Sequence, residues 1–204
     1  MLHNIKQYIG FLANSTNQHG VHSPFVYSLV TKCFYNKTKY SDYTKISQYK
    51  KKTQNKKNIK SEKILYRLIK YFNPQNILQF APTPNNINNY VMQLAQPNTN
   101  ITTLKFSKLD TLETNKTFDF IFLDLNTILL KNNNLTSTFN ILINKHTHNN
   151  SILVCKPNFK IKETNTIWSS LKTHPKITVT INIYFFKIIF FRKEQCKEKF
   201  TIRI

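Results

Sequence analysis

Side chains that could do chemistry are few in this chain, and their spacing matches no catalytic or metal-binding motif. His19 and His22 could both bind a metal ion, but no acid or thiol lies near them, so we expect their imidazoles to hydrogen-bond the start of a helix. The three cysteines are widely spaced and form no C-x-x-C pair, which favours buried, inert thiols. Asp124 and Asn126 follow an apolar run and belong either to a ligand pocket or to a strand end held by backbone donors. These patterns assign no catalytic residue and no metal ligand.

Glycine is scarce, and its scarcity excludes several classes of site. The chain has two glycines, Gly10 and Gly20, and none after residue 20. A glycine-rich phosphate loop, an intact Gly-x-Gly-x-x-Gly dinucleotide turn and an EF-hand each need glycine where the backbone turns or approaches a ligand. None of these sites can be present in its usual form.

The net charge of +21 suggests nucleic-acid binding, but its make-up argues against that role. Lysine outnumbers arginine 27 to 3, although arginine has the bidentate fork that suits phosphate. Residues with A/T-rich codons are abundant and those with G/C-rich codons are scarce, so mutational bias could supply much of the lysine. We therefore expect nucleic acid not to be the main partner.

Length and hydropathy indicate one soluble domain. The chain has 204 residues, of which 40% are hydrophobic, enough for a sizeable core. No stretch approaches the roughly 18 to 20 uncharged apolar residues of a membrane helix, and residues 1–15 lack the pattern of a signal peptide. We expect a cytoplasmic protein with no membrane partner.

The first 58 residues predict a helical extension that ends in a lysine-rich connector. Apolar residues recur at helical spacing near the N-terminus: Ile5, Tyr8, Ile9 and Leu12. Ser23 can cap a second helix, Pro24 suits its first position, and that helix should end near Phe34. Residues 43–60 hold seven lysines and no acid, which indicates an exposed, mobile connector.

From residue 59 onward, helical and strand patterns alternate. Strands are expected at 76–80, 101–106, 118–125, 151–156, 177–183 and 185–192. Helices are expected at 61–72, 87–95, 135–144 and 163–173. Short connections between them predict an α/β fold with a mostly parallel, twisted sheet, helices on both faces and a closing antiparallel hairpin. Ligands of such sheets bind beyond the carboxyl ends of the strands.

Four segments resemble a known family. They are residues 19–35 (HGVHSPFVYSLVTKCFY), 65–72 (LYRLIKYF), 174–181 (HPKITVTI) and 189–203 (IFFRKEQCKEKFTIR). Together with the order of elements, they resemble a bacterial family of class I S-adenosylmethionine-dependent methyltransferases close to the small-molecule O-methyltransferases. The resemblance implies a Rossmann-like methyltransferase domain over residues 59–204, preceded by the extension of residues 1–58, and S-adenosylmethionine as cofactor.

The resemblance places the methyl-donor site at strand ends where this chain departs from the family. The family has an acid and a Gly-x-x-x-Gly turn after the first strand; here the acid aligns with Gln79 and the glycines align with Ala81 and Asn85. The acid that binds the ribose hydroxyls after the second strand aligns with Lys105, whose ammonium group offers no acceptor.

Two further strand ends complete this comparison with the family. Asp124 and Asn126 match two residues of the family's Asp-Gly-Asn-His segment. The family's Asp-Asp pair aligns with Lys156 and Pro157, and a lysine would repel an oxygen-ligated metal rather than hold it. Gln79, Ala81, Asn85, Lys105, Asp124 and Asn126 are therefore the predicted positions of the cofactor site, most of them substituted.

Three functions stay open on the sequence. The resemblance implies methyl transfer from S-adenosylmethionine to an oxygen or nitrogen of a small acceptor that the sequence does not name. A descendant of such an enzyme that has lost donor binding and persists as a scaffold is the second, and a lysine-rich nucleic-acid-binding protein is the third. Each lost hydrogen bond costs roughly 1–3 kcal/mol, so the joint loss of glycines and acids favours the second.

Overall fold

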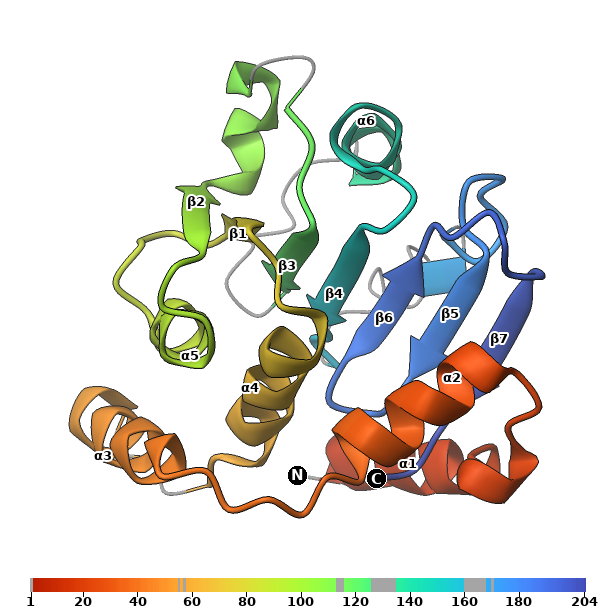
Figure 1. The fold of residues 1–204 in the computed structure, drawn as a ribbon, viewed down its shortest axis with the longest axis horizontal. Coiled ribbons are helices and arrows are strands. Elements are labelled where there is room, and N and C mark those ends of the chain that lie inside the picture. Colours follow the sequence, from red (N-terminus) through yellow and green to blue (C-terminus); the bar gives the residue numbers. More distant parts are fainter. Residues whose placement is uncertain are drawn as a thin grey trace.

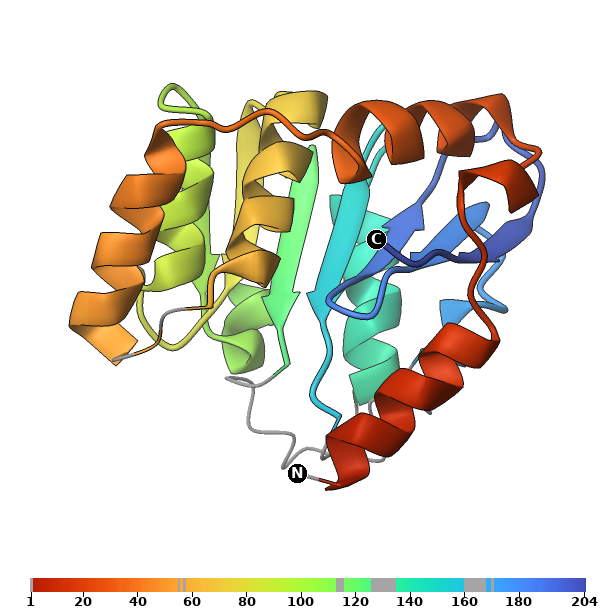
Figure 2. The ribbon, with the colours of Figure 1, turned by 90° about the horizontal axis from the view of Figure 1, so that it is seen from below.

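The computed structural model describes residues 2–54, 56, 58–112, 116–125, 135–159, 168–169 and 171–204. Within these ranges the chain forms a seven-stranded sheet in the order β2-β1-β3-β4-β6-β5-β7, with helices on both faces (Figure 1, Figure 2). The strands are β1 (Asn76–Phe80), β2 (Asn100–Leu104), β3 (Phe120–Asp124), β4 (Ile152–Lys156), β5 (Val179–Asn182), β6 (Lys187–Phe190) and β7 (Glu198–Thr201). The predicted α/β, Rossmann-like architecture is confirmed.

Helices cover the sheet unequally. They are α1 (Leu2–Ala13), α2 (Pro24–Leu29), α3 (Asp42–Gln54), α4 (Lys60–Phe72), α5 (Ile87–Ala95) and α6 (Leu135–His146), with a π-helical turn at Val30–Phe34 and a 3-10 turn at Phe106–Thr111. Helices α2, α4 and α5 lie on one face and α6 lies on the other (Figure 2). Every helix in the described ranges is too short or too polar to cross a bilayer. The predicted helix at 163–173 lies mostly outside the described residues.

The residues of the central strand β3 explain why helices cover both faces of the sheet. Phe120 and Phe122 pack into the core under α2, α4 and α5, whereas Ile121 and Leu123 pack into the core under α6. All four side chains are fully buried. Because successive side chains of a strand point to opposite faces, a strand that is apolar at every position needs helices on both sides.

The far side of the sheet contains the predicted hairpin and one strand that was not predicted. Strand β6 runs antiparallel to both β4 and β5, as expected for the closing hairpin. Strand β7 then pairs parallel with β5 at the edge of the sheet. Its residues Glu198 and Lys199 are polar, so β7 lacks the apolar alternation that marks a strand in the sequence.

The lysine-rich segment is more ordered than the sequence predicts. Residues 42–54 form helix α3, and Ile46 and Lys50 are buried. Lys50 Nζ lies 2.7 Å from Glu62 Oε1 and donates to the carbonyl of Asn58 at 2.8 Å. The expectation of an exposed connector is therefore wrong in part, because a buried ion pair uses Lys50 inside the fold. The other lysines of α3 are exposed as expected. The division of the chain at residue 58 stays a prediction.

The predicted helix start at Ser23 is confirmed, but the role given to the histidines is not. Ser23 Oγ accepts from the backbone N–H of Val26 at 3.5 Å, and Pro24 occupies the first helical position. His19 and His22 are both exposed. The serine hydroxyl, and not an imidazole, satisfies the start of α2.

Helix α1 forms where predicted, but its apolar stripe faces outward. The exposed fractions of Ile5, Tyr8, Ile9 and Leu12 are 50%, 43%, 60% and 36%. Phe11, in the last turn of the helix, is buried. The helix lies beyond the carboxyl edge of the sheet, at the lower right of Figure 2.

The two glycines should respond in opposite ways to alanine. A Cβ on residue 20 would collide with Thr16 Oγ1, and backbone hydrogen bonds to residues 201 and 203 hold Thr16 in place; Gly20→Ala should therefore destabilise the fold by roughly 1–3 kcal/mol. A Cβ on residue 10 meets no atom within 4 Å, so Gly10→Ala should stabilise α1 by up to about 1 kcal/mol.

Urea unfolding followed by circular dichroism measures both glycine effects. The double variant Gly20→Ala with Thr16→Ala should recover part of the loss, since the colliding hydroxyl is gone. Equal free energies of unfolding for Gly10→Ala and Gly20→Ala would contradict this account.

Candidate functional site

Gln79, where the resemblance places the first acid of the donor site, is buried in β1 and tied to a helix cap. Its Nε2 donates to Asn86 Oδ1 at 2.8 Å, whereas its Oε1 has no hydrogen-bond partner in the described part of the chain. Asn86 Oδ1 also accepts from the backbone N–H groups of Asn88 and Asn89, both at 3.0 Å, and so caps α5. An amide stands where the resemblance implies a carboxylate, and it donates to the side chain that caps α5.

The loop after β1 does not need the family's glycines for its own conformation. Neither Ala81 nor Asn85 has a positive φ. Ala81 is buried and donates its backbone N–H to Leu104 O at 3.0 Å, while Asn85 is exposed. Asn86 Nδ2 fastens the loop by donating to the carbonyl of Thr83 at 2.7 Å. Whether the Cβ atoms of Ala81 and Asn85 would obstruct a cofactor stays a prediction.

Lys105 lies at the neighbouring strand end, as predicted. It follows Leu104, which pairs with Phe80 in the register of β1 and β2, so the ends of these strands lie side by side. The lysine is exposed, and its carbonyl accepts from the N–H of Lys108 in the following 3-10 turn. A ribose hydroxyl placed here would meet an ammonium donor instead of a carboxylate acceptor.

Asp124 is buried at the end of β3 and already has partners. Its Oδ2 accepts from Asn88 Nδ2 at 3.1 Å and lies 3.4 Å from Lys156 Nζ. Asp124 and Lys156 face each other in the register of β3 and β4. Lys156, at the position where the resemblance implies an Asp-Asp pair, thus supplies positive charge to this buried acid. Asn126 lies outside the described residues.

A pocket of about 520 Å³ lies further along the same edge of the sheet, beneath α1. We call it the α1 pocket; its walls include Gln7, Gly10, Phe159, Asn182, Tyr184 and Lys187. Tyr184 has a φ of 66°, a left-handed conformation that costs a residue other than glycine roughly 1–2 kcal/mol. Its ring stacks on Phe159, with centroids 4.8 Å apart and planes inclined by 20°.

Lys187 is the titratable group of this pocket with the most altered environment. It begins β6 and is 7% exposed, and its Nζ lies 5.2 Å from the ring centroid of Trp168. Burial, and to a lesser degree the charge of Lys172, lowers the pKa of Lys187 to about 8. One feature of the sequence points to this residue: Lys187 interrupts an otherwise apolar run from residue 184 to 191.

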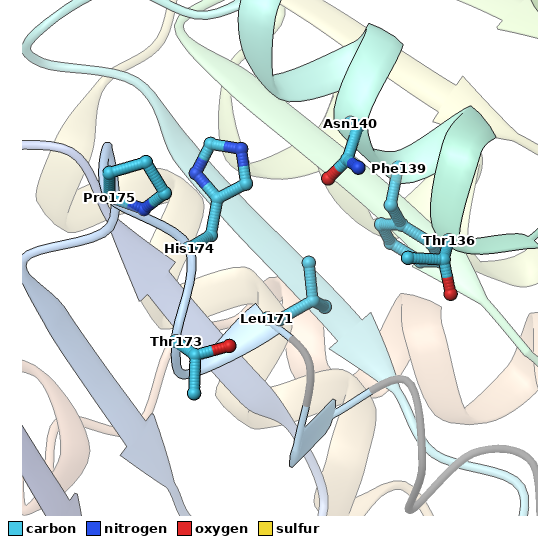
Figure 3. A pocket seen from close by; sticks show the side chains of 7 residues that line it. All are labelled: Thr136, Phe139, Asn140, Leu171, Thr173, His174 and Pro175. Carbon is cyan, nitrogen blue, oxygen red and sulfur yellow. The ribbon is translucent and has the colours of Figure 1, made fainter.

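A second pocket, between α6 and the segment before β5, is smaller. Figure 3 shows its lining side chains: Thr136, Phe139, Asn140, Leu171, Thr173, His174 and Pro175. Burial lowers the pKa of His174, and the charges of Lys176 and Lys197 lower it further. The volume is about 230 Å³, below the roughly 300–1,000 Å³ of typical small-molecule sites. The α1 pocket is therefore the better candidate for a ligand.

Solved structures identify the fold. No family model matches the chain, and no curated protein matches its sequence. The SAH-bound methyltransferase PaMTH1 of Podospora anserina matches with a TM-score of 0.55 and 9% identity, over 85% of this chain and 97% of its own. The chain has a methyltransferase fold. A structure from Klebsiella pneumoniae described as an O-methyltransferase gives 0.53 at 9% identity, over 78% and 94% of the two chains.

A third structure was solved with the donor itself. The O-methyltransferase TomG of Streptomyces achromogenes, involved in tomaymycin synthesis and in complex with SAM, matches with a TM-score of 0.51 and 10% identity, over 76% of this chain and 91% of its own. Structural matches at such low sequence identity establish a shared fold. The chemistry of the site has to be inferred from the residues of this chain.

The ion pair at the strand ends should be measurable as a coupling energy. Asp124→Asn and Lys156→Met should each destabilise the fold, and the double variant should lose less than their sum, by about 1 kcal/mol. Lys105→Met, which removes an exposed lysine from the same edge, should change the free energy of unfolding by less than about 0.5 kcal/mol. Strict additivity of the two single changes in urea unfolding would show that the pair contributes nothing.

The three thiols should differ in reactivity. Burial raises the pKa of Cys33 and that of Cys155 to about 12, whereas Cys196 is exposed, contrary to the expectation that all three are buried. Because the thiolate is the reactive form, a thiol reagent at pH 8 should modify Cys196 rapidly and the other two only after denaturation. Cys196→Ser should remove the fast reaction, and a fast reaction that persists in this variant would contradict the assignment.

Proposed function

We propose that this chain is a non-catalytic protein of the methyltransferase fold that binds S-adenosylmethionine weakly or not at all. The proposal rests on Asp124, the acid at the carboxyl edge of the sheet, whose charge is neutralised by Lys156. Asp124 is occupied by Asn88 and Lys156, so the one acid retained at the predicted donor site is engaged within the protein. Gln79 is engaged through its Nε2, which donates to Asn86, while its Oε1 has no hydrogen-bond partner in the described residues.

Charge at this edge opposes the donor. S-adenosylmethionine carries a positive sulfonium at its reacting centre, and the exposed Lys105 places an ammonium group at the end of β2, beside the end of β1. Like charges repel, and they repel more strongly in a site that excludes water. The neutral product, S-adenosylhomocysteine, would not meet this repulsion at its sulfur.

The loss of hydrogen bonds adds to the repulsion. Two ribose hydroxyls without an acceptor would cost roughly 1–3 kcal/mol each if buried. Since every 1.4 kcal/mol is a factor of ten in affinity, these two groups alone weaken binding by a factor of about 30 to 10⁴. Enzymes generally half-saturate between about 1 μM and 1 mM, so a loss of this size removes useful binding.

Methyl transfer to a small acceptor is the second candidate, and the α1 pocket favours it. The pocket has the volume of a small-molecule site and lies at the edge of the sheet where such folds bind ligands. Methyl transfer depends mainly on aligning donor and acceptor in a dry pocket, so it needs few catalytic side chains once both are bound. This candidate fails if the donor does not bind.

Calorimetric titration with S-adenosylmethionine tests the proposal. The unmodified chain should show no saturable heat below about 1 mM, and the triple variant Ala81→Gly, Asn85→Gly, Lys105→Glu should gain at least tenfold in affinity if the rest of the donor site survives. Lys108→Glu is the matched control, since it makes the same charge change on an exposed residue three positions along the chain.

S-adenosylhomocysteine separates the two causes. If charge repulsion is the main obstacle, the unmodified chain should bind the homocysteine compound more tightly than the sulfonium donor. Micromolar binding of S-adenosylmethionine by the unmodified chain, or methyl transfer from it to any small acceptor, would refute the proposal and establish the second candidate.

A further inference from the structure

Helix α1 carries most of the exposed apolar surface in the described part of the chain. Of the five large hydrophobic side chains that are exposed there, four lie on this helix and form its apolar stripe: Ile5, Tyr8, Ile9 and Leu12. Their spacing of three and four residues brings them onto one face of the helix. Single exposed apolar residues need no explanation, whereas a contiguous stripe marks a surface that contacts a partner.

The other side of α1 is already seated on the protein. Gln7, Gly10 and Asn14 line the α1 pocket, and with about 3.6 residues per turn they lie on the side of the helix away from the stripe. Figure 2 shows α1 at the margin of the molecule, beyond the strands. The sheet therefore cannot bury the stripe while the helix keeps this orientation, and its partner has to come from outside the chain.

A second copy of this chain is a poor partner for the stripe. Each copy has a net charge of +21, and like charges that face each other across an interface weaken association. A helix of 12 residues is about 18 Å long and about 10 Å wide, so the stripe offers on the order of 200 Å². Stable protein interfaces bury about 800 Å² on each partner.

Charge around the stripe favours an anionic surface instead. The first 41 residues contain four lysines and no acid. Lys6 is exposed and borders the stripe on α1, and the exposed Arg203 is held close by, since its backbone N–H donates to the carbonyl of Thr16 just after the helix. A lysine beside an apolar surface can lay its methylene groups along that surface and keep its ammonium group among polar headgroups.

We propose that α1 docks the protein onto a lipid bilayer that contains anionic lipid. Ile5, Ile9 and Leu12 lie at the boundary between headgroups and acyl chains, and Lys6 lies among the headgroups. At about 18 Å the helix is shorter than the hydrocarbon core of about 30 Å, so it lies flat in the interface. A bilayer offers no groove and needs none, because a single convex helix can sink into it.

This docking surface goes beyond the proposed function and uses no residue of the predicted donor site. It departs from the expectation of no membrane partner, which rested on the lack of a spanning segment in the sequence. A single short helix with nearby lysines gives reversible binding that depends on lipid charge and on salt.

Sedimentation with lipid vesicles tests the proposal. The full chain should bind phosphatidylcholine vesicles that contain about 30% phosphatidylglycerol at least tenfold more tightly than vesicles of phosphatidylcholine alone, because only the first are anionic. A single myristoyl chain half-saturates near 0.1 mM lipid, so the absence of binding to anionic vesicles at about 1 mM would overturn the proposal.

Variants of the stripe separate docking from adsorption, because a chain of this charge is attracted to any anionic surface. The double variant Ile5→Ser, Ile9→Ser should lose at least tenfold in affinity for anionic vesicles, since two apolar side chains no longer leave water. Isoleucine and serine have similar helix propensities, so α1 should still form. Tyr27→Ser is the control, because Tyr27 is the exposed large apolar residue of the described chain that lies outside α1. Equal affinity of the double variant and the unmodified chain would overturn the proposal.

A matched pair of lysines locates the charged contact. Lys6→Glu should weaken binding to anionic vesicles at least fivefold, since each basic residue near the surface contributes a factor of about five. Lys108→Glu makes the same change in net charge on an exposed residue of the turn Phe106–Thr111, at the other end of the molecule (Figure 1), and should weaken binding less than twofold. An equal loss in the two variants would show that net charge, and not α1, holds the protein at the bilayer.

Two further measurements distinguish the bilayer from a second copy of the chain. Ile9→Trp and Tyr27→Trp each add one indole to the native Trp168, and lipid brominated on its acyl chains should quench the first variant more strongly, because residue 9 lies against the acyl boundary. Equal quenching would overturn the proposal. Light scattering without lipid should give the same mass for the unmodified chain and for Ile5→Ser, Ile9→Ser. A dimer that dissociates in this double variant would assign the stripe to a second copy and overturn the proposal.

Discussion

This chain has no glycine after residue 20, so every later turn is made by residues that carry a side chain. This constraint affects both the predicted donor site and the α1 pocket. Most L-residues avoid left-handed backbone, so turns that usually need glycine must be rebuilt or strained. The loop after β1 is of the first kind: Ala81 and Asn85 keep a negative φ, and the amide of Asn86 holds the loop closed. The turn at Tyr184 is of the second kind.

The side chains at the predicted donor positions are tied to their neighbours inside the protein. With a carboxylate in β1, the capping amide of Asn86 would face a second acceptor; with Gln79 there, an N–H donor meets the Asn86 oxygen. At the neighbouring strands Lys156 supplies the positive charge that keeps Asp124 buried without a cofactor or metal to pair with it. In both cases the side chain has a partner within the protein and is less available to a cofactor. Internal partners of this kind are what we expect if the chain keeps its stability without binding the donor, as proposed above.

The sequence predicted those elements whose structure follows from the pattern of their own residues. Residues 120–123 are all apolar, a pattern that favours a strand between two layers of helices. The prediction failed where tertiary partners decide. Lys50 is buried because Glu62 lies opposite it, and the polar strand Glu198–Thr201 forms because β5 presents a free edge to it. Neither partner can be found by reading the neighbouring residues.

The residues of the candidate site were likewise predictable from the sequence only in part. Position along the chain was enough to place Gln79, Lys105 and Asp124 at adjacent strand ends, since parallel strands bring their carboxyl ends to one edge. The α1 pocket was missed because its walls come from the two ends of the chain, and because periodicity does not say which side of an amphipathic helix turns inward.

Helix α1 shows what an outward apolar side implies about energetics. With Ile5 and Ile9 in solvent, the helix is held mainly by Phe11, by Tyr8 against Tyr184, and by the chain that follows it. That chain is anchored, since Thr16 pairs with Ile202 beside the edge strand β7. An element held by few apolar contacts opens at lower free energy than the core does. We therefore expect α1, which lines the pocket, to open more readily than the sheet.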